Sequence, residues 1–289
     1  MKVTDNSTQE LRRLWVVCLL LANLIFAIIY TANYFGGFQS TELLAKDMAM
    51  RIWPTAPVDE RITLIGFTEP DIRKYGYPAS DELLARVLER LTQAKASSIG
   101  VDIYRDIPVP PGGTRLDSVL KANQNIIWIT KLQGSGGRVQ APAVIDGTDQ
   151  VGFNDMVVDP GGIIRRGLLF MDDGENYYFS LPLLLSMPYL SSRDLGLAAD
   201  PDDPNLVRLG NTTIIPFEKD EGGYVDADAG GYQFLLDYKG MPGKFPKYTF
   251  EELLSGKVPE EQLRDKIIII GASANSVNDT VFTPFGHSY

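Results

Sequence analysis

The sequence predicts an α/β fold, with an N-terminal transmembrane helix followed by a mostly parallel α/β sheet domain that carries a β-rich inserted lobe. Three observations support this prediction. A long uncharged stretch lies near the N-terminus, and strand-length apolar runs alternate with amphipathic helical patterns after it. A middle region rich in glycine, proline and aspartate then interrupts that alternation.

The stretch from Leu14 to Tyr34 contains no charged residue. At about 1.5 Å per residue it can cross a hydrocarbon core of roughly 30 Å. A cleaved signal peptide is the alternative, but the apolar run exceeds the usual length and no small-x-small cleavage pair follows it. Arg12 and Arg13 precede the run, so the positive-inside rule places residues 1–13 in the cytoplasm. We therefore expect residues 38–289 to be periplasmic or extracellular, anchored in the inner (cell) membrane.

A second helix follows the membrane segment directly. Ser40 or Thr41 can cap a helix that runs to about Arg51, and Trp53 with Pro54 would end it. Such a helix could carry motion between the outer domain and the bilayer, or it could be a passive stalk.

An alternation of strands and helices begins after this helix. The apolar runs of strand length are residues 62–67, 99–103 and 126–130. Ser80 and Asp81 cap an amphipathic helix between the first two runs, and residues 116–122 form a short helix before the third. The expected result is a right-handed β-α-β-α-β unit with parallel strands. Residues 267–270 have the same buried character, so we expect them in the same sheet.

Residues 139–248 have a different composition, in which turn residues separate short apolar pieces. One helix is predicted at 181–186, with Ser180 as its cap. We interpret this region as a mostly β insertion. Arg165 and Arg166 within it could clamp an anion, but in so acidic a chain we expect them to pair with neighbouring carboxylates.

Several short motifs follow one another in an order that identifies a family. They are Leu64 to Glu69, Ser98 to Ile103, Gly152 to Asn154, Asp159 with Arg165 and Arg166, Asp237 to Gly240, and Asp279 with Thr283 to Gly286. Their order and spacing resemble the second type of CHASE domain, the cyclases/histidine kinases associated sensory extracellular domain, over nearly all of the chain after the membrane helix. The chain departs from the family after the first strand. The family has two adjacent acidic residues there, whereas this chain has Thr68 and Glu69.

The resemblance implies the N-terminal input half of a bacterial transmembrane receptor. Such a module would relay a small-molecule or envelope signal to a cytoplasmic output domain, a nucleotide cyclase or a histidine kinase, that lies outside this segment. It also implies a homodimer and no catalysis in this segment. A periplasmic protein-docking module is the alternative function, and a membrane-tethered hydrolase is less favoured because no Gly-x-Ser-x-Gly elbow occurs.

Composition excludes several functions. The formal net charge of −10, without a run of Lys and Arg, argues against a nucleic-acid partner. Cys18 is the only cysteine and His287 the only histidine. Neither a Cys/His zinc site nor a Ser-His-Asp triad of ordinary build is therefore expected. We predict no catalytic residue, no bound metal and no cofactor.

Ligands of open parallel sheets bind beyond the carboxyl ends of the strands. The polar residues expected at those ends are Glu69, Asp102, Arg105, Lys131 and Ser273. Both signs of charge meet there, so the sequence predicts a small polar or zwitterionic ligand. The alternative for Asp102 is that it caps a turn and pairs with Arg105 or a neighbouring lysine.

Overall fold

The computed structural model describes residues 3–52, 57–132, 137–172, 174–241, 243–277 and 280–288. The chain divides into two compact units. Met1–Ala49 and Glu218–Asp228 form the first, whereas Met50–Phe217 and Ala229–Tyr289 form the second. The predicted helix stop at Trp53 and Pro54, the motif residue Asp279 and the side chain of His287 lie outside the described residues.

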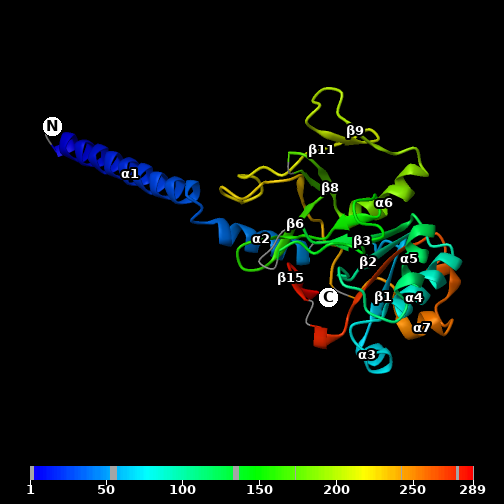
Figure 1. The fold of residues 1–289 in the computed structure, drawn as a ribbon. Helices are drawn as coiled ribbons and strands as arrows, with labels where there is room; N and C mark the ends of the chain where they lie inside the picture. The colour runs from blue at the N-terminus through cyan, green and yellow to red at the C-terminus, as the bar shows by residue number, and fades with distance from the viewer. Residues whose placement is uncertain are drawn as a thin grey trace. The chain divides into compact units, whose positions relative to one another are not determined.

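The first unit contains the predicted membrane helix, α1 (Val3–Tyr34) (Figure 1). Its apolar part, Gln9–Tyr34, is long enough to cross a bilayer, and none of it is buried within the chain. Asn23 lies in the middle of this part, and its amide donates to the carbonyl of Leu19 at 2.8 Å. One N–H donor of the Asn23 amide is therefore satisfied within the helix.

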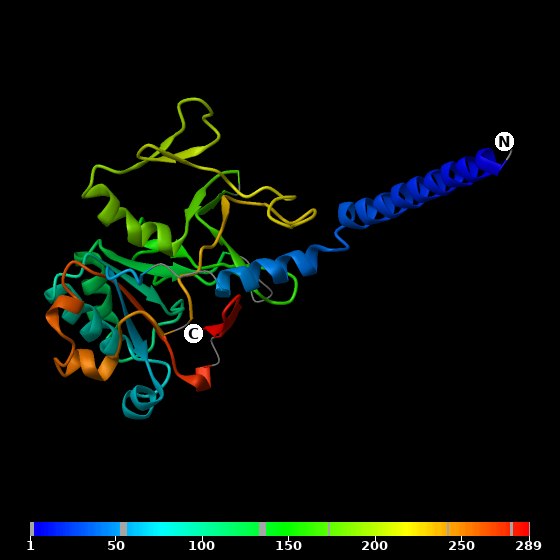
Figure 2. The same cartoon turned by 180° about the vertical axis from the view of Figure 1, so that it is seen from behind.

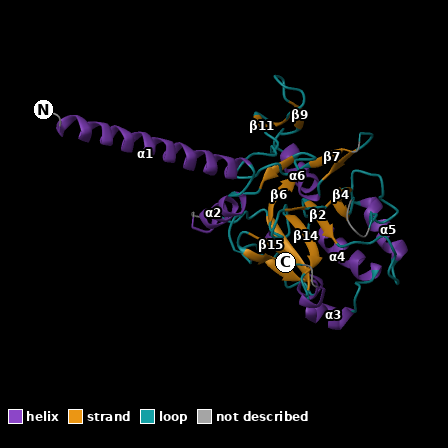
Figure 3. Cartoon of the chain, turned by 90° about the vertical axis from the view of Figure 1, so that its left-hand side faces the viewer, coloured by secondary structure: helices purple, strands orange, loops and turns teal. Residues whose placement is uncertain are grey.

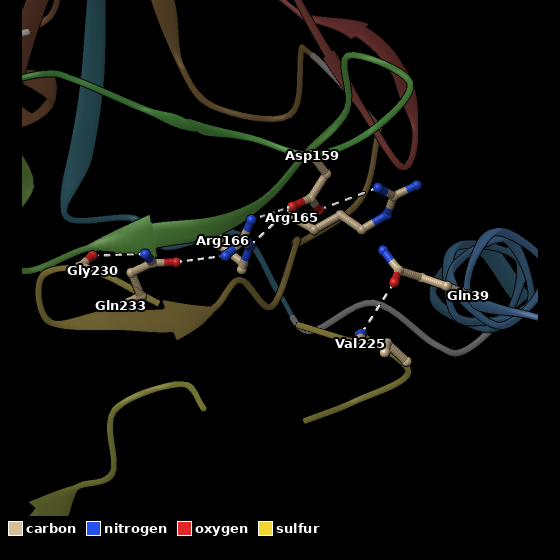
Figure 4. A network of polar contacts seen from close by, with 7 residues as sticks. All are labelled: Gln39, Asp159, Arg165, Arg166, Val225, Gly230 and Gln233. Atoms are coloured by element: carbon tan, nitrogen blue, oxygen red, sulfur yellow. Dashed lines mark hydrogen bonds and ion pairs between the residues drawn. The ribbon is translucent and has the colours of Figure 1, made fainter. Parts of the chain in front are cut away.

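The helix after the membrane segment, α2 (Gln39–Ile52), begins one residue earlier than its predicted cap. The carbonyl of Phe38 already accepts the backbone N–H groups of Thr41 and Glu42, both at 2.9 Å. Ser40 and Thr41 therefore lie inside the helix, and the prediction that either caps it is wrong. The start of α2 contacts the segment Glu218–Asp228, where the Val225 N–H donates to Gln39 Oε1 at 3.1 Å (Figure 4).

The second unit is built on a six-stranded sheet in which every pairing is parallel. In spatial order its strands are β13 (Lys247–Thr249), β1 (Ile62–Phe67), β14 (Ile267–Ala272), β2 (Ser98–Asp102), β3 (Ile126–Thr130) and β4 (Val151–Phe153). The predicted strands exist and the late strand joins their sheet. Strands β1 and β2 are not neighbours, because β14 lies between them and pairs with both.

Helices cover both faces of this sheet (Figure 1; Figure 2 gives the view from behind). The helices of the unit are α3 (Glu69–Tyr75), α4 (Asp81–Gln93), α5 (Gly113–Ala122), α6 (Leu181–Ser191) and α7 (Phe250–Leu254). The core joins α4, α5 and α7 to the sheet, and the rings of Phe67 on β1 and Phe250 on α7 lie 4.9 Å apart. On the other face, Ser98 Oγ donates to the carbonyl of Leu185 on α6 at 2.8 Å.

Helix α4 begins as the sequence predicts. Ser80 is its N-cap, and its Oγ accepts the backbone N–H of Leu83 at 3.3 Å. Its apolar residues at helical spacing are all buried, namely Leu83, Leu84, Val87, Leu88 and Leu91. Each such side chain contributes roughly 1.5–3 kcal/mol when it leaves water, so this face alone fixes α4 against the sheet.

The inserted lobe consists mainly of small antiparallel sheets, as predicted (Figure 3). Its strands are β5 (Val157–Val158), β6 (Ile164–Leu168), β7 (Phe170–Asp172), β8 (Tyr177–Phe179), β9 (Leu197–Ala199), β10 (Val207–Leu209), β11 (Thr212–Ile214) and β12 (Gln233–Leu235). A separate hairpin pairs β15 (Val281–Thr283) with β16 (Gly286–Ser288). The two ends of the predicted insertion differ from expectation, since β4 and β13 belong to the parallel sheet.

Arg165 and Arg166 pair with a carboxylate, as expected, and do not stand open as an anion clamp (Figure 4). Asp159 accepts a bond from Arg165 Nη1 at 3.2 Å and two from Arg166, at 2.9 Å from Nε and 2.7 Å from Nη2. Arg166 Nη1 also donates to Gln233 Oε1 at 2.8 Å. All four side chains are buried, so this network links β6 to β12 inside the lobe.

Candidate functional site

A cleft of about 520 Å³ lies where β1, β2, β3 and β14 end. The registers Phe67↔Ala272 and Asp102↔Gly271 bring the carboxyl ends of three of these strands side by side. This is the edge at which open parallel sheets bind ligands. The polar side chains of the lining are Tyr77, Asp102, Tyr104, Arg105 and Asn154. Apolar side chains form most of the remaining wall, among them Phe67, Ile103, Ile129 and Met156.

A short chain of hydrogen bonds connects three of the polar residues. Tyr104 Oη donates to Asn154 Oδ1 at 2.8 Å, and Asn154 Nδ2 donates to Asp102 Oδ1 at 2.8 Å. Asp102 ends β2, whereas Asn154 directly follows β4. The bond from the tyrosine hydroxyl fixes the orientation of the amide, because the amide oxygen accepts and its NH₂ group must then face the carboxylate. The Asp102 carboxylate is therefore held in a defined position at the cleft.

Arg105 lies deeper than Asp102, with only 4% of its side chain exposed. Its Nη2 donates to the carbonyl of Ala79 at 2.6 Å, and its Nη1 lies 3.5 Å from Asp81 Oδ1. The other oxygen of Asp81 accepts the backbone N–H of Val109 at 3.1 Å. Burial lowers the pKa of the Arg105 guanidinium, and the charge of Asp81 opposes that shift. Arginine nevertheless stays protonated in proteins, so the pair fastens the segment after β2 to the start of α4.

Three of the predicted site residues do not line this cleft. Glu69 Oε1 accepts the backbone N–H of Ser276 at 2.8 Å, and this bond lowers the Glu69 pKa below its ordinary value of 4.5. Lys131 pairs through its backbone with Val139, with N to O distances of 2.9 and 3.0 Å. Ser273 donates its N–H to the carbonyl of Phe67 at 3.0 Å.

The cleft therefore brings together Asp102 and Arg105 of the predicted set, and it adds Asn154, Tyr104 and Tyr77. Arg105 forms its ion pair with Asp81, and Asp102 accepts a hydrogen bond from Asn154. Asn154 carried a signal in the sequence, since it directly follows a Gly-Phe pair in one of the motifs described above.

A second cavity of about 660 Å³ lies over the face of the sheet, against Ile62, Leu64 and Ile269. Two of the three lysines in its lining have local partners: Lys239 pairs with Asp237 at 2.6 Å, and Lys244 donates to the carbonyl of Lys239 at 3.0 Å. It does not lie at the carboxyl ends of the strands, so we favour the first cleft as the candidate site. Within the described residues, no three His, Cys, Asp or Glu side chains converge as metal ligands.

Comparison with known proteins places the chain in a family. A family model described as the CHASE2 domain matches residues 19–289. No curated protein and no solved structure matched the chain. CHASE2 domains are extracytoplasmic sensor modules of signalling proteins, typically without catalytic activity and associated with cyclases and kinases. The match contains α2, all six strands of the parallel sheet and the cleft at their carboxyl ends. Because it spans most of the sequence, the chain belongs to the CHASE2 domain family.

Proposed function

We propose that this chain senses a small molecule outside the cell membrane and relays its binding to a cytoplasmic output domain, a nucleotide cyclase or a histidine kinase. The observation that carries the proposal is the cleft at the carboxyl ends of the parallel strands, with its oriented Asp102 carboxylate. A volume of about 520 Å³ lies in the range of small-molecule sites. The mixture of apolar wall and few polar groups supports binding of a compact ligand.

The order of elements along the chain supports a relay. Strand β1 contributes Phe67 to the cleft, and residues 53–61 join β1 to α2. Helix α2 in turn follows α1 after the turn at residues 35–38. A ligand can shift the balance of two receptor conformations only by the difference in its affinity for them. Binding that displaces β1 relative to its neighbours would give such a difference.

A cleft-filling variant tests the binding site. Met156 lines the cleft and is 54% exposed, so Met156→Trp can narrow the cleft without burying a new group in the core. Ile215→Trp is the matched control, because Ile215 is 64% exposed and does not line the cleft. The full chain in lipid nanodiscs would be screened for thermal stabilisation by amino acids, short carboxylic acids and amines.

We expect at least one compound that stabilises the wild type and Ile215→Trp but not Met156→Trp. If every stabilising compound acts equally on Met156→Trp, sensing through this cleft is wrong.

Membrane topology gives an independent test. With residues 1–13 in the cytoplasm, a reporter enzyme that is active only in the periplasm should be active when fused after Gly240. A cytoplasmic reporter at the same position is the control and should be inactive. The opposite pair of results would place the sensor domain on the wrong side of the membrane for this function.

We also propose that the receptor works as a homodimer, with α2 as a contact close to the membrane. The chain has one cysteine, so a Cys18→Ser background leaves no competing thiol. Single cysteines at residues 43–50 should then form crosslinks with helical periodicity if two copies of α2 meet. Uniform absence of crosslinks in membranes would contradict the dimer.

A second candidate function is docking of another envelope protein. It is favoured by an apolar surface in the lobe that contains Phe170, Tyr177, Phe179 and Val207, with Tyr177 70% exposed. A Tyr177→Ser, Phe179→Ser double variant that abolishes signalling, while Met156→Trp leaves it intact, would favour docking over ligand sensing.

A further inference from the structure

The charges at the cleft are not symmetric. The one cation of the described lining, Arg105, is 4% exposed in its side chain and lies beside Asp81, with its Nη2 donating to a backbone carbonyl. Its positive charge is therefore offset by a carboxylate within the fold. Asp102 is only half-buried at the lining. The Asp102 carboxylate is therefore more accessible to a ligand in the cleft than the Arg105 guanidinium is.

The Asp102 carboxylate is also prepared for binding. The hydrogen bonds from Tyr104 to Asn154 and from Asn154 to Asp102, both 2.8 Å, orient it before any ligand arrives. Such preorganisation removes part of the entropic cost that a mobile side chain would add to binding. A carboxylate has about four lone-pair positions, so more than one donor can bind it at the same time.

Aromatic side chains accompany this carboxylate. Tyr104 and Tyr77 line the cleft and are 44% and 59% exposed, and Phe67 forms part of its wall. A cation beside aromatic rings gains from the negative potential of their faces, and this attraction grows where water is excluded. A carboxylate together with aromatic rings is the combination that recognises organic ammonium groups.

We propose that the ligand of this cleft is an organic ammonium compound, whose charged group binds Asp102 and whose apolar body contacts Phe67, Ile129 and Met156. The proposal rests on the proposed sensing function and adds the chemical class of the ligand. It predicts that affinity depends on the positive charge of the ligand as well as on its shape.

The test uses matched pairs of probes that differ in charge. Phenethylammonium is compared with 2-phenylethanol, and choline with 3,3-dimethylbutanol, by calorimetric titration into the full chain in nanodiscs. In at least one pair the ammonium compound should bind tenfold or more tightly than its neutral counterpart, a difference of about 1.4 kcal/mol. The two pairs also distinguish a primary from a quaternary ammonium ligand.

Two variants connect this preference to the site. Asp102→Asn keeps the size of the side chain and removes its charge. The ratio of the Kd of the neutral compound to the Kd of the ammonium compound should therefore fall close to one. Asp106→Asn is the matched control, because Asp106 is exposed four residues further along the chain and does not line the cleft. It makes the same change in net charge and should keep the preference. Thermal unfolding of both variants verifies that they fold.

Several results would overturn the proposal. One is equal binding of the charged and neutral probes, or no binding of either ammonium compound at millimolar concentration. Another is a preference that survives Asp102→Asn, or that Asp106→Asn reduces as strongly. These failures are distinct from failure of the sensing function itself. An anionic or neutral compound whose effect is lost in Met156→Trp would leave the cleft as a sensor site and exclude ammonium recognition.

Discussion

The substitution Asp159→Asn tests the buried ion network of the lobe. Asparagine has nearly the same size as aspartate, so the change removes the charge with little change in packing. The Asp159 side chain is completely buried and accepts three hydrogen bonds from Arg165 and Arg166, whose side chains are each 5% exposed. After the change, two buried guanidinium groups would lack this counter-charge.

The expected cost follows from that geometry. Removing one partner of a buried ion pair typically destabilises a protein by about 3–5 kcal/mol. The amide oxygen of asparagine can still accept both bonds that Arg166 donates to Asp159 Oδ1. Its NH₂ group, however, faces the Nη1 donor of Arg165, so we expect the loss to be about 3 kcal/mol. This is a large fraction of a typical folding free energy of roughly 5–15 kcal/mol.

Urea unfolding of the full chain in mild detergent, followed by near-ultraviolet circular dichroism, measures this loss. At an m-value of about 1–3 kcal/mol/M the midpoint should fall by roughly 1–3 M. Asp59→Asn is the control, because the ion pair of Asp59 with Arg61 is exposed and should contribute less than about 1 kcal/mol. If Asp159→Asn costs no more than this control, Asp159 does not stabilise the buried arginines and the reasoning is refuted.

Three further predictions concern the parallel sheet and its helices. A Cβ at Gly152 would lie 2.9 Å from backbone atoms of α6, so Gly152→Ala should lower the free energy of unfolding, measured in urea, by about 1–3 kcal/mol. Gly196→Ala is the control, because Gly196 has open space around it and the free energy of unfolding should change by less than about 0.5 kcal/mol. Ser80→Ala removes the cap of α4 and should cost about 1 kcal/mol by the same measurement. The hydrogen bond from Lys74 lowers the pKa of Glu251 below its ordinary value of 4.5. The stabilisation of the fold by the Lys74–Glu251 bond is therefore present above pH 4.5 and is lost as the pH falls through the lowered pKa. The melting temperature of Glu251→Gln should accordingly lie below that of the wild type at pH 7, and the two should converge in acid.

The regular elements of the sheet domain could be predicted from sequence because each carries a strong periodic pattern. The strands of a parallel sheet, however, are all apolar on both faces, so nothing in residues 267–270 indicates which strands they pair with. Helix α7 carried a readable signal. Thr249 and Glu252 form a capping box, with Thr249 Oγ1 accepting the Glu252 N–H at 3.1 Å and the reciprocal bond at 2.9 Å. The same Thr-x-x-Glu spacing in the sequence predicts a helix start.

The candidate site was predictable to the extent that its strands were. Asp102 and Arg105 follow a recognised strand, and the structure places both at the cleft. The sequence does not place Asn154 at the ligand site, because β4 has only three residues and lies within residues 139–248, which are predicted to be the β-rich insertion. The carboxyl end of β4 is therefore not among the strand ends at which the ligand is expected. Glu69 and Ser273 follow recognised strands too, but their bonds to Ser276 and Phe67 belong to local chain packing.

The position of β14 has a consequence for how the domain is made. Strands β1 and β2 do not pair with each other in the sheet, and both pair with β14. Strand β14 follows β1 by on the order of 200 residues, and contacts between such distant parts of a chain slow folding. While the chain is being synthesised and exported, β1 and β2 therefore have unpaired edges until residues 267–272 emerge. Exposed strand edges of this kind pair readily with other chains. The sheet of this sensor domain is therefore completed only when its central strand arrives, and until then the edges of β1 and β2 are the sites at which aggregation would start.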